Sequence, residues 1–123
     1  IIEDFGGWGL FQELLRALKS IGDRLGVGPG EVALRWTLDH PGVSGCIVGA
    51  TSTRNLQRNA KVFDIALTEA DRALLAGIRD RRSGPEGDCY ELENDRTGRH
   101  GRIMRPNQNA LEDKPWPGTG APA

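Results

Sequence analysis

One short β-favouring run, residues 43–48, constrains the fold of this 123-residue chain more than any other feature. The run is flanked by glycines and lacks polar alternation, which is typical of a central strand covered on both faces. A single strand cannot form a sheet, because its backbone groups would be buried without hydrogen-bond partners. We therefore expect the partner strands to come from a region upstream of residue 1 or from another chain.

Two helical patterns precede this run. In the first, apolar residues at spacings of three and four predict a helix of roughly four turns, which Gly26 ends. The second has Pro29 in its first turn, is apolar on most sides and ends before Pro41, so we expect a largely buried helix. The apolar residues are Phe11, Leu14, Leu15, Leu18, Ile21 and Leu25 in the first pattern, and Val32, Ala33, Leu34, Trp36 and Leu38 in the second.

Two more helical patterns follow the run. Residues 53–63 place their apolar side chains on one helix face. Thr68 and Asp71 then form an approximate capping box ahead of a fourth helix. The predicted order is therefore helix, helix, strand, helix, helix. The apolar residues are Leu56, Ala60 and Phe63 in the third pattern, and Leu74, Leu75 and Ile78 in the fourth.

The composition changes near residue 81, and we divide the chain into a body, residues 1–82, and an irregular tail, residues 83–123. The tail is charged, interrupted by glycine and proline, and poor in core-forming residues. We expect its last dozen or so residues to be disordered. The apolar residues that are expected to attach its earlier part to the body are Tyr90, Leu92, Ile103 and Met104.

Charge and composition exclude several classes of function. A net charge of −1 gives no general attraction to nucleic acid or to anionic lipid. No stretch approaches the roughly 20 apolar residues that span a bilayer, and no signal peptide is visible, so a cytoplasmic location is expected. Cys46 and Cys89 lack the spacing of a disulfide framework or a zinc site, and we interpret both as free thiols. Because residue 1 is Ile1 and not methionine, we expect the chain to be part of something longer or a processed product.

The junction between the strand and the third helix is a candidate anion site. Small residues, Gly49 to Ser52, stand directly before the helix that begins at Thr53. First-turn N–H groups and the positive end of a helix dipole point at whatever lies there, so the junction has room for a phosphate or nucleotide. Simple tight-turn chemistry is the alternative explanation of the same residues.

Several motifs, taken in order, resemble the C-terminal portion of the aldo/keto reductases. The resemblance covers about residues 1–80, and the segments 84–93 and 99–104 also look like the ends of bacterial members. It implies an α/β fold, in which this chain is the C-terminal part of a (β/α)8 TIM barrel, mostly helical, with an irregular tail. The motifs are Glu31-Val32-Ala33-Leu34-Arg35-Trp36, His40-Pro41-Gly42-Val43, Ile47-Val48-Gly49-Ala50-Thr51-Ser52, Leu56 with Asn59, and Leu67-Thr68-Glu69.

The resemblance assigns a dinucleotide to the junction. It implies that the loop after the last strand, Gly49, Ala50, Thr51 and Ser52, lines the pyrophosphate and the adenosine ribose with its phosphate. Barrels of this kind commonly bind phosphate near their final loops. The implied cofactor is NADP, with NAD possible, and the implied substrate is a small-molecule carbonyl or alcohol.

Four residues of the following helix extend this assignment. Asn55 stands where many members have an arginine or glutamine near the 2′-phosphate, and Arg54 is one residue earlier and could supply that charge. Arg58 replaces the glutamate that usually faces the adenine, whereas Asn59 retains the asparagine that contacts the base. Arg58 could stack on the adenine, pair with the 2′-phosphate, or be an ordinary solvated helix arginine.

No catalytic residue is assigned within this chain. In the family a tyrosine acts as general acid, and a lysine, an aspartate and a histidine tune it, all from the earlier part of the barrel. An untuned tyrosine, with a pKa of about 10, gives up its proton reluctantly near neutrality. Packing is the expected role of Tyr90, and neither His40 nor His100 is given a catalytic role. We expect the chain by itself to be inactive.

Three functional hypotheses follow. The first is the cofactor-binding segment of an NADP(H)-dependent aldo/keto reductase. The second is a nucleotide-sensing subunit without fast catalysis, as proposed for channel-associated relatives of these reductases. The third is a helix-turn-helix DNA-binding module, because residues 20–27 followed by a helix imitate that motif. Only Arg35 would read bases, and the charge balance does not suit a phosphate backbone.

Overall fold

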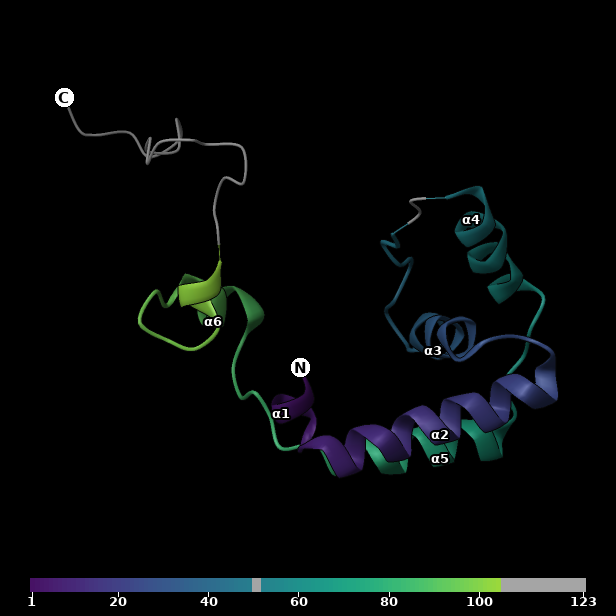
Figure 1. Ribbon diagram of the computed structural model, residues 1–123, viewed down its shortest axis with the longest axis horizontal. Coiled ribbons are helices and arrows are strands. Elements are labelled where there is room, and N and C mark those ends of the chain that lie inside the picture. The colour runs from purple at the N-terminus through teal and green to yellow at the C-terminus, as the bar shows by residue number, and fades with distance from the viewer. Residues whose placement is uncertain (50–51, 105–123) are drawn as a thin grey trace. The chain divides into compact units, whose positions relative to one another are not determined.

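The computed structural model describes residues 1–49 and 52–104. The chain divides into two compact units, residues 1–85 and 86–123. Regular structure in the described residues is helical throughout (Figure 1). The first unit contains α1 (Ile2–Phe5), α2 (Trp8–Leu25), α3 (Pro29–Leu38), α4 (Thr53–Ala60), the 3-10 helix η1 (Lys61–Phe63) and α5 (Glu69–Arg79), and the second contains α6 (Cys89–Asn94) and η2 (Gly101–Ile103).

Helices α2 and α5 lie side by side and form the frame of the first unit (Figure 1). The predicted stripe on α2 is confirmed, and Gly26 ends the helix in a left-handed conformation with φ 71°. This conformation is accessible to glycine without steric cost, which explains the sharp stop. The core between α2, α3 and α5 comprises Ala17, Leu18, Ile21, Val32, Leu67, Leu75 and Ile78.

Helix α5 begins at the predicted capping box. The Thr68 hydroxyl accepts a hydrogen bond from the Asp71 N–H at 3.2 Å, and Asp71 Oδ2 accepts one from the Thr68 N–H at 2.8 Å. Two backbone donors at the start of the helix are thereby satisfied. Because this signal is local in sequence, it correctly fixed the start of α5.

Helix α3 is less buried than its sequence suggests. Val32 is buried in the core and Glu31 is buried at the first turn, but Leu34, Trp36 and Leu38 are only half-buried. Pro29 occupies the first turn, as predicted. Helix α3 packs against α2 and η1, and part of its apolar surface nevertheless stays accessible.

The predicted central strand at residues 43–48 is wrong for the structure described here. Residues 43–49 have no regular structure, Ile47 is fully exposed, and no strand occurs in the described ranges 1–49 and 52–104. A strand is held by hydrogen bonds to a neighbouring strand, and the described residues provide no neighbour. The β-favouring composition of the run is therefore not sufficient to form a strand.

The third predicted helix is confirmed as α4 continued by η1. Its apolar face is exposed at Leu56 and Phe63, and α4 contains no buried residue, whereas Val62 in η1 is buried. Helix α4 is thus held to the first unit by polar contacts and by the packing of η1 on α3.

The second unit contains two short elements that the sequence pattern does not predict. Asp88 caps α6 by accepting a hydrogen bond from the Tyr90 N–H at 2.8 Å. Tyr90 and Ile103, which were expected to pack, are exposed. The disorder predicted for the end of the tail falls on residues outside the described ranges. None of the helices in those ranges combines the length and the apolar composition needed to cross a bilayer.

Candidate functional site

The candidate site starts at the N-terminus of α4. Ser52 is the N-cap residue, and its Oγ accepts a hydrogen bond from the Asn55 N–H at 3.3 Å. This bond satisfies one first-turn donor, and the helix dipole makes the same end electropositive. Two of the predicted loop residues, Ala50 and Thr51, lie outside the described residues.

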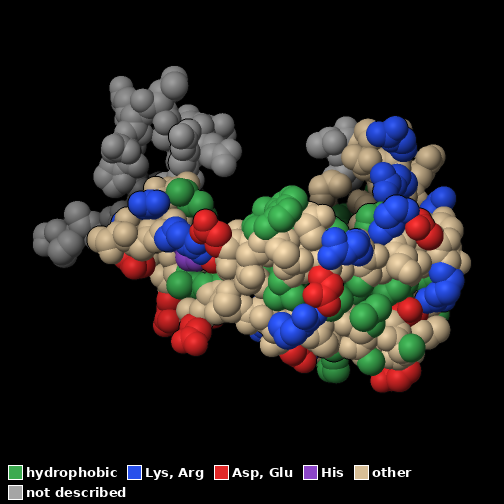
Figure 2. Space-filling view, turned by 60° about the horizontal axis from the view of Figure 1, so that its bottom comes forward, with side chains coloured by type: hydrophobic (Ala, Val, Ile, Leu, Met, Phe, Trp, Pro, Cys, Tyr) green, Lys and Arg blue, Asp and Glu red, His purple; other side chains and the backbone are tan. Residues whose placement is uncertain are grey.

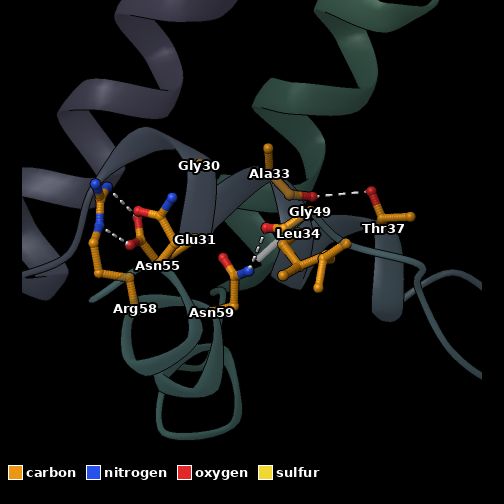
Figure 3. Close-up of a pocket in the computed structure, with 10 residues that line it drawn as sticks. Gly30, Glu31, Ala33, Leu34, Thr37, Gly49, Asn55, Arg58 and Asn59 are labelled. Carbon is orange, nitrogen blue, oxygen red and sulfur yellow. Dashed lines mark hydrogen bonds and ion pairs between the residues drawn. The ribbon is translucent and has the colours of Figure 1, made fainter. Parts of the chain in front are cut away.

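A pocket of about 490 Å³ lies between α3, residues 48–49 and α4 (Figure 3). Four of the residues predicted to bind a cofactor line this pocket, whereas Ser52 and Arg54 are not among its lining residues. The four are Gly49, Asn55, Arg58 and Asn59. Helix α3 provides the opposite wall with Gly30, Glu31, Ala33, Leu34 and Thr37. The volume falls within the range of small-molecule sites, and the pocket is widely open to solvent.

Asn59 connects α4 to the segment that precedes it. Its Nδ2 lies 3.5 Å from the carbonyl oxygen of Gly49, as drawn in Figure 3. A hydrogen bond of that length is weak, so the Asn59 amide is easily released to another acceptor. The contact brings a predicted loop residue and a predicted helix residue together at one end of the pocket.

At the other end of the pocket, Arg58 pairs with Glu31. The Arg58 Nε donates to Glu31 Oε1 at 2.7 Å, and Nη2 donates to Oε2 at 3.3 Å (Figure 3). The Glu31 side chain is only 4% exposed, whereas that of Arg58 is 51% exposed. The hydrogen bond from Arg58 lowers the pKa of Glu31 below its ordinary value, against the opposing effect of burial. Arg58 is therefore committed to a carboxylate and is not a plain solvated arginine.

Glu31 is a site residue that sequence reasoning missed. It was recognised only as part of a motif, and 27 residues separate it from Arg58. An acidic residue in the first turn of a helix is explained by the helix dipole alone, so nothing local indicated a second role. Only the packing of α4 beside α3 brings the two charges together.

The free positive charge of the site lies on other residues. Arg54 and Lys61 are exposed, and neither has an ion-pair partner within the part of the chain that the structure describes. Figure 2 shows basic side chains over the region that holds α4. Lys61 is the C-cap residue of α4, so an anion at the start of this helix would meet Arg54 and the helix dipole.

His40, which was given no catalytic role, contacts residues of α3 and α5. His40 Nδ1 lies 2.7 Å from the carbonyl oxygen of Trp36, and its Nε2 lies 3.1 Å from Nη1 of Arg79. The Arg79 guanidinium also lies over the Trp36 ring, 5.4 Å from the centroid. This cluster joins the end of α3 to the end of α5.

Comparison with known proteins identifies the family of this chain and a similar protein. The family model described as "Aldo/keto reductase family" matches residues 2–80. The chain is 39% identical over 59 residues to a protein of Arabidopsis thaliana named "Probable voltage-gated potassium channel subunit beta". That alignment covers 46% of this chain and 18% of the relative, so the chain spans a small part of the relative's length. No solved structure matches the chain significantly.

Proposed function

Because this chain belongs to the aldo/keto reductase family, we propose that it holds the adenosine end of NADP(H) in a protein that transfers hydride between the nicotinamide and a carbonyl or alcohol. The observation that carries the proposal is the first turn of α4, which holds the Ser52 cap, the exposed Arg54 and Asn55, a residue that lines the pocket between α3 and α4. A helix N-terminus with a nearby guanidinium suits a phosphate.

Within this proposal every predicted residue except Arg58 has a place at the cofactor. The loop from Gly49 to Ser52 holds the pyrophosphate and ribose, Arg54 and Asn55 lie beside the 2′-phosphate, and Asn59 contacts the base. Residues 43–48 supply the last strand of a (β/α)8 barrel once neighbouring strands are present. NADP is preferred to NAD because of the unpaired charge of Arg54, and NAD remains the alternative cofactor.

Dissociation constants for NADPH and NADH, measured in the protein that carries this chain, test the proposal. Arg54→Ala should weaken NADPH binding more than NADH binding, because only NADPH carries the 2′-phosphate. Arg16→Ala is a matched control, since Arg16 is an exposed arginine on α2. A ratio that Arg54→Ala leaves unchanged would count against Arg54. Failure of the folded protein to bind either cofactor would overturn the proposal.

The catalytic machinery is proposed to lie outside this chain. Tyr90, its single tyrosine, is exposed on α6 in the second unit, and we give it no acid role. The purified 123-residue chain should therefore not oxidise NADPH in the presence of an aldehyde. Steady consumption of NADPH by that chain would contradict this part of the proposal.

A second candidate function is nucleotide sensing without fast catalysis. The similarity to a relative named as a potassium channel subunit favours it. Comparison of binding with turnover separates the two candidates. Tight NADPH binding with single-turnover hydride transfer on the scale of minutes would favour a sensor, whereas multiple rapid turnovers would favour a metabolic reductase.

A further inference from the structure

The Glu31–Arg58 pair lies directly over a glycine. A Cβ atom added to Gly28 would lie 2.7 Å from Glu31 Oε2 and 2.8 Å from Arg58 Nη2. The absence of a side chain at Gly28 therefore lets the pair lie against the start of α3. In Figure 3 the Arg58 guanidinium extends toward Glu31 and away from Asn59 and Gly49. Arg58 thus lines the pocket, while its guanidinium is paired with Glu31.

We propose that Glu31 is a specificity-determining residue for the dinucleotide, because it holds the Arg58 guanidinium away from the ribose 2′-phosphate and leaves Arg54 as the discriminating cation. The inference rests on the proposed function, since it concerns the same cofactor site. It adds a residue on α3 that acts through Arg58 and does not itself touch the cofactor.

Charge and geometry both support this role. Glu31 engages one edge of the guanidinium through two hydrogen bonds, at 2.7 and 3.3 Å. A phosphate that recruited Arg58 would have to leave the Glu31 carboxylate buried and unpaired, which is strongly unfavourable. The carboxylate also cancels the charge that would attract a second phosphate. Arg54, on the same helix but exposed and without an ion-pair partner among the described residues, has neither restriction.

Glu31→Gln tests the proposal because it keeps the shape of the side chain and removes its charge. In the protein that carries this chain, the ratio of the NADH to the NADPH dissociation constant should rise roughly tenfold, the worth of one charge-assisted hydrogen bond. NADPH binding should also become more sensitive to salt, because an additional cation then faces the phosphate. The double variant Glu31→Gln with Arg58→Gln should lose this gain.

Gly28→Ala provides a second test that leaves every charge in place. The new methyl group meets the ends of two flexible side chains, so it should separate the pair and shift the ratio in the same direction as Glu31→Gln. Gly77→Ala is the control, because a Cβ at Gly77 meets no atom within 4 Å. A loss of protein stability alone would weaken the binding of both cofactors equally, and the ratio of their dissociation constants would stay constant.

The outcomes separate the two proposals. If the folded wild-type protein binds neither NADPH nor NADH, the proposed function fails and this inference fails with it. If both cofactors bind but the ratio is unchanged in Glu31→Gln and in Gly28→Ala, the role of Glu31 alone is overturned. A gain that persists when Arg58 is also replaced would likewise overturn it.

Discussion

Arg24 of α2 and Asp71 of α5 form an ion pair across 47 residues of sequence, with 2.5 Å between Arg24 Nη2 and Asp71 Oδ2. The same Oδ2 atom accepts hydrogen bonds from the Thr68 N–H at 2.8 Å and from the Thr68 hydroxyl at 2.7 Å. One carboxylate therefore caps α5 and attaches its first turn to α2. The pairing of these two helices is fixed at this point.

Replacing Asp71 should destabilise the fold through both functions. Asp71→Ala removes a capping residue and leaves Arg24 and Thr68 without their acceptor, so we expect a loss of about 1–3 kcal/mol in the free energy of unfolding. Urea titration of the protein measures this loss. Glu69→Ala is the control, because Glu69 lies in the same first turn but is exposed. Equal losses in the two variants would show that Asp71 has no special role.

Stability should fall in acid because three buried or half-buried carboxylates have lowered pKa values. Arg58 lowers the pKa of Glu31, and hydrogen bonds from Arg35 and Arg72 lower that of Asp39. Burial would raise the pKa of Asp71, but hydrogen bonds from Thr68 and the pair with Arg24 outweigh it.

The sign of the effect follows from proton uptake. Above the ordinary values of 4.5 for Glu31 and 3.8 for Asp39 and Asp71, the folded and unfolded states are both ionised, and the stabilisation is complete. As the pH falls below these values, the unfolded chain binds more protons, so stability is lost until the folded-state pKa is passed. Urea titrations from neutral pH to below 3.8 should show this fall. Asp39→Asn should reduce the slope, and an identical slope would contradict the assignment.

Core packing gives a matched pair of neighbouring leucines on α5. The Leu75 side chain belongs to the core and is 1% exposed, whereas Leu74 is 48% exposed. Leu75→Ala should cost about 2–5 kcal/mol of unfolding free energy, because it removes buried methyl groups and leaves a cavity. Leu74→Ala should cost under about 1 kcal/mol. Thermal unfolding of both variants checks the difference, and similar melting temperatures would refute the assigned core.

Two glycines of α2 should respond in opposite directions to the same substitution. A Cβ at Gly22 would lie 2.7 Å from the carbonyl oxygen of Val27 and 3.2 Å from the carbonyl carbon of Gly28, both backbone atoms. Gly22→Ala should therefore destabilise the protein by about 1–3 kcal/mol. A Cβ at Gly9 meets nothing within 4 Å, so Gly9→Ala should stabilise α2 by about 0.5–1 kcal/mol. Urea unfolding measures both effects, and a stabilised Gly22→Ala variant would exclude the close approach.

The helices of the frame were predictable because their signals are local. The apolar period and Gly26 define α2, while Thr68 and Asp71 define the start of α5. The strand at residues 43–48 was predicted from the same kind of signal, but its formation depends on a partner that is remote in sequence. Composition indicates what a segment favours, and it cannot supply the neighbour that makes it a strand.

For the site, the resemblance to a family identified four residues that line the pocket. The structure adds that one of them, Arg58, forms an ion pair with Glu31. Gly49, Asn55, Arg58 and Asn59 line the pocket. The sequence left the role of Arg58 open, since its partner lies on another helix. Glu31 could not be recognised, because an ion pair between residues far apart in sequence exists only after α3 and α4 have packed.

The close fit of Gly28 beneath Glu31 and Arg58 has an evolutionary consequence. A descendant that acquires a side chain at Gly28 loses room for the pair, and one that replaces Arg58 has no further need of a glycine there. Substitutions at Gly28, Glu31 and Arg58 should therefore appear together across related lineages.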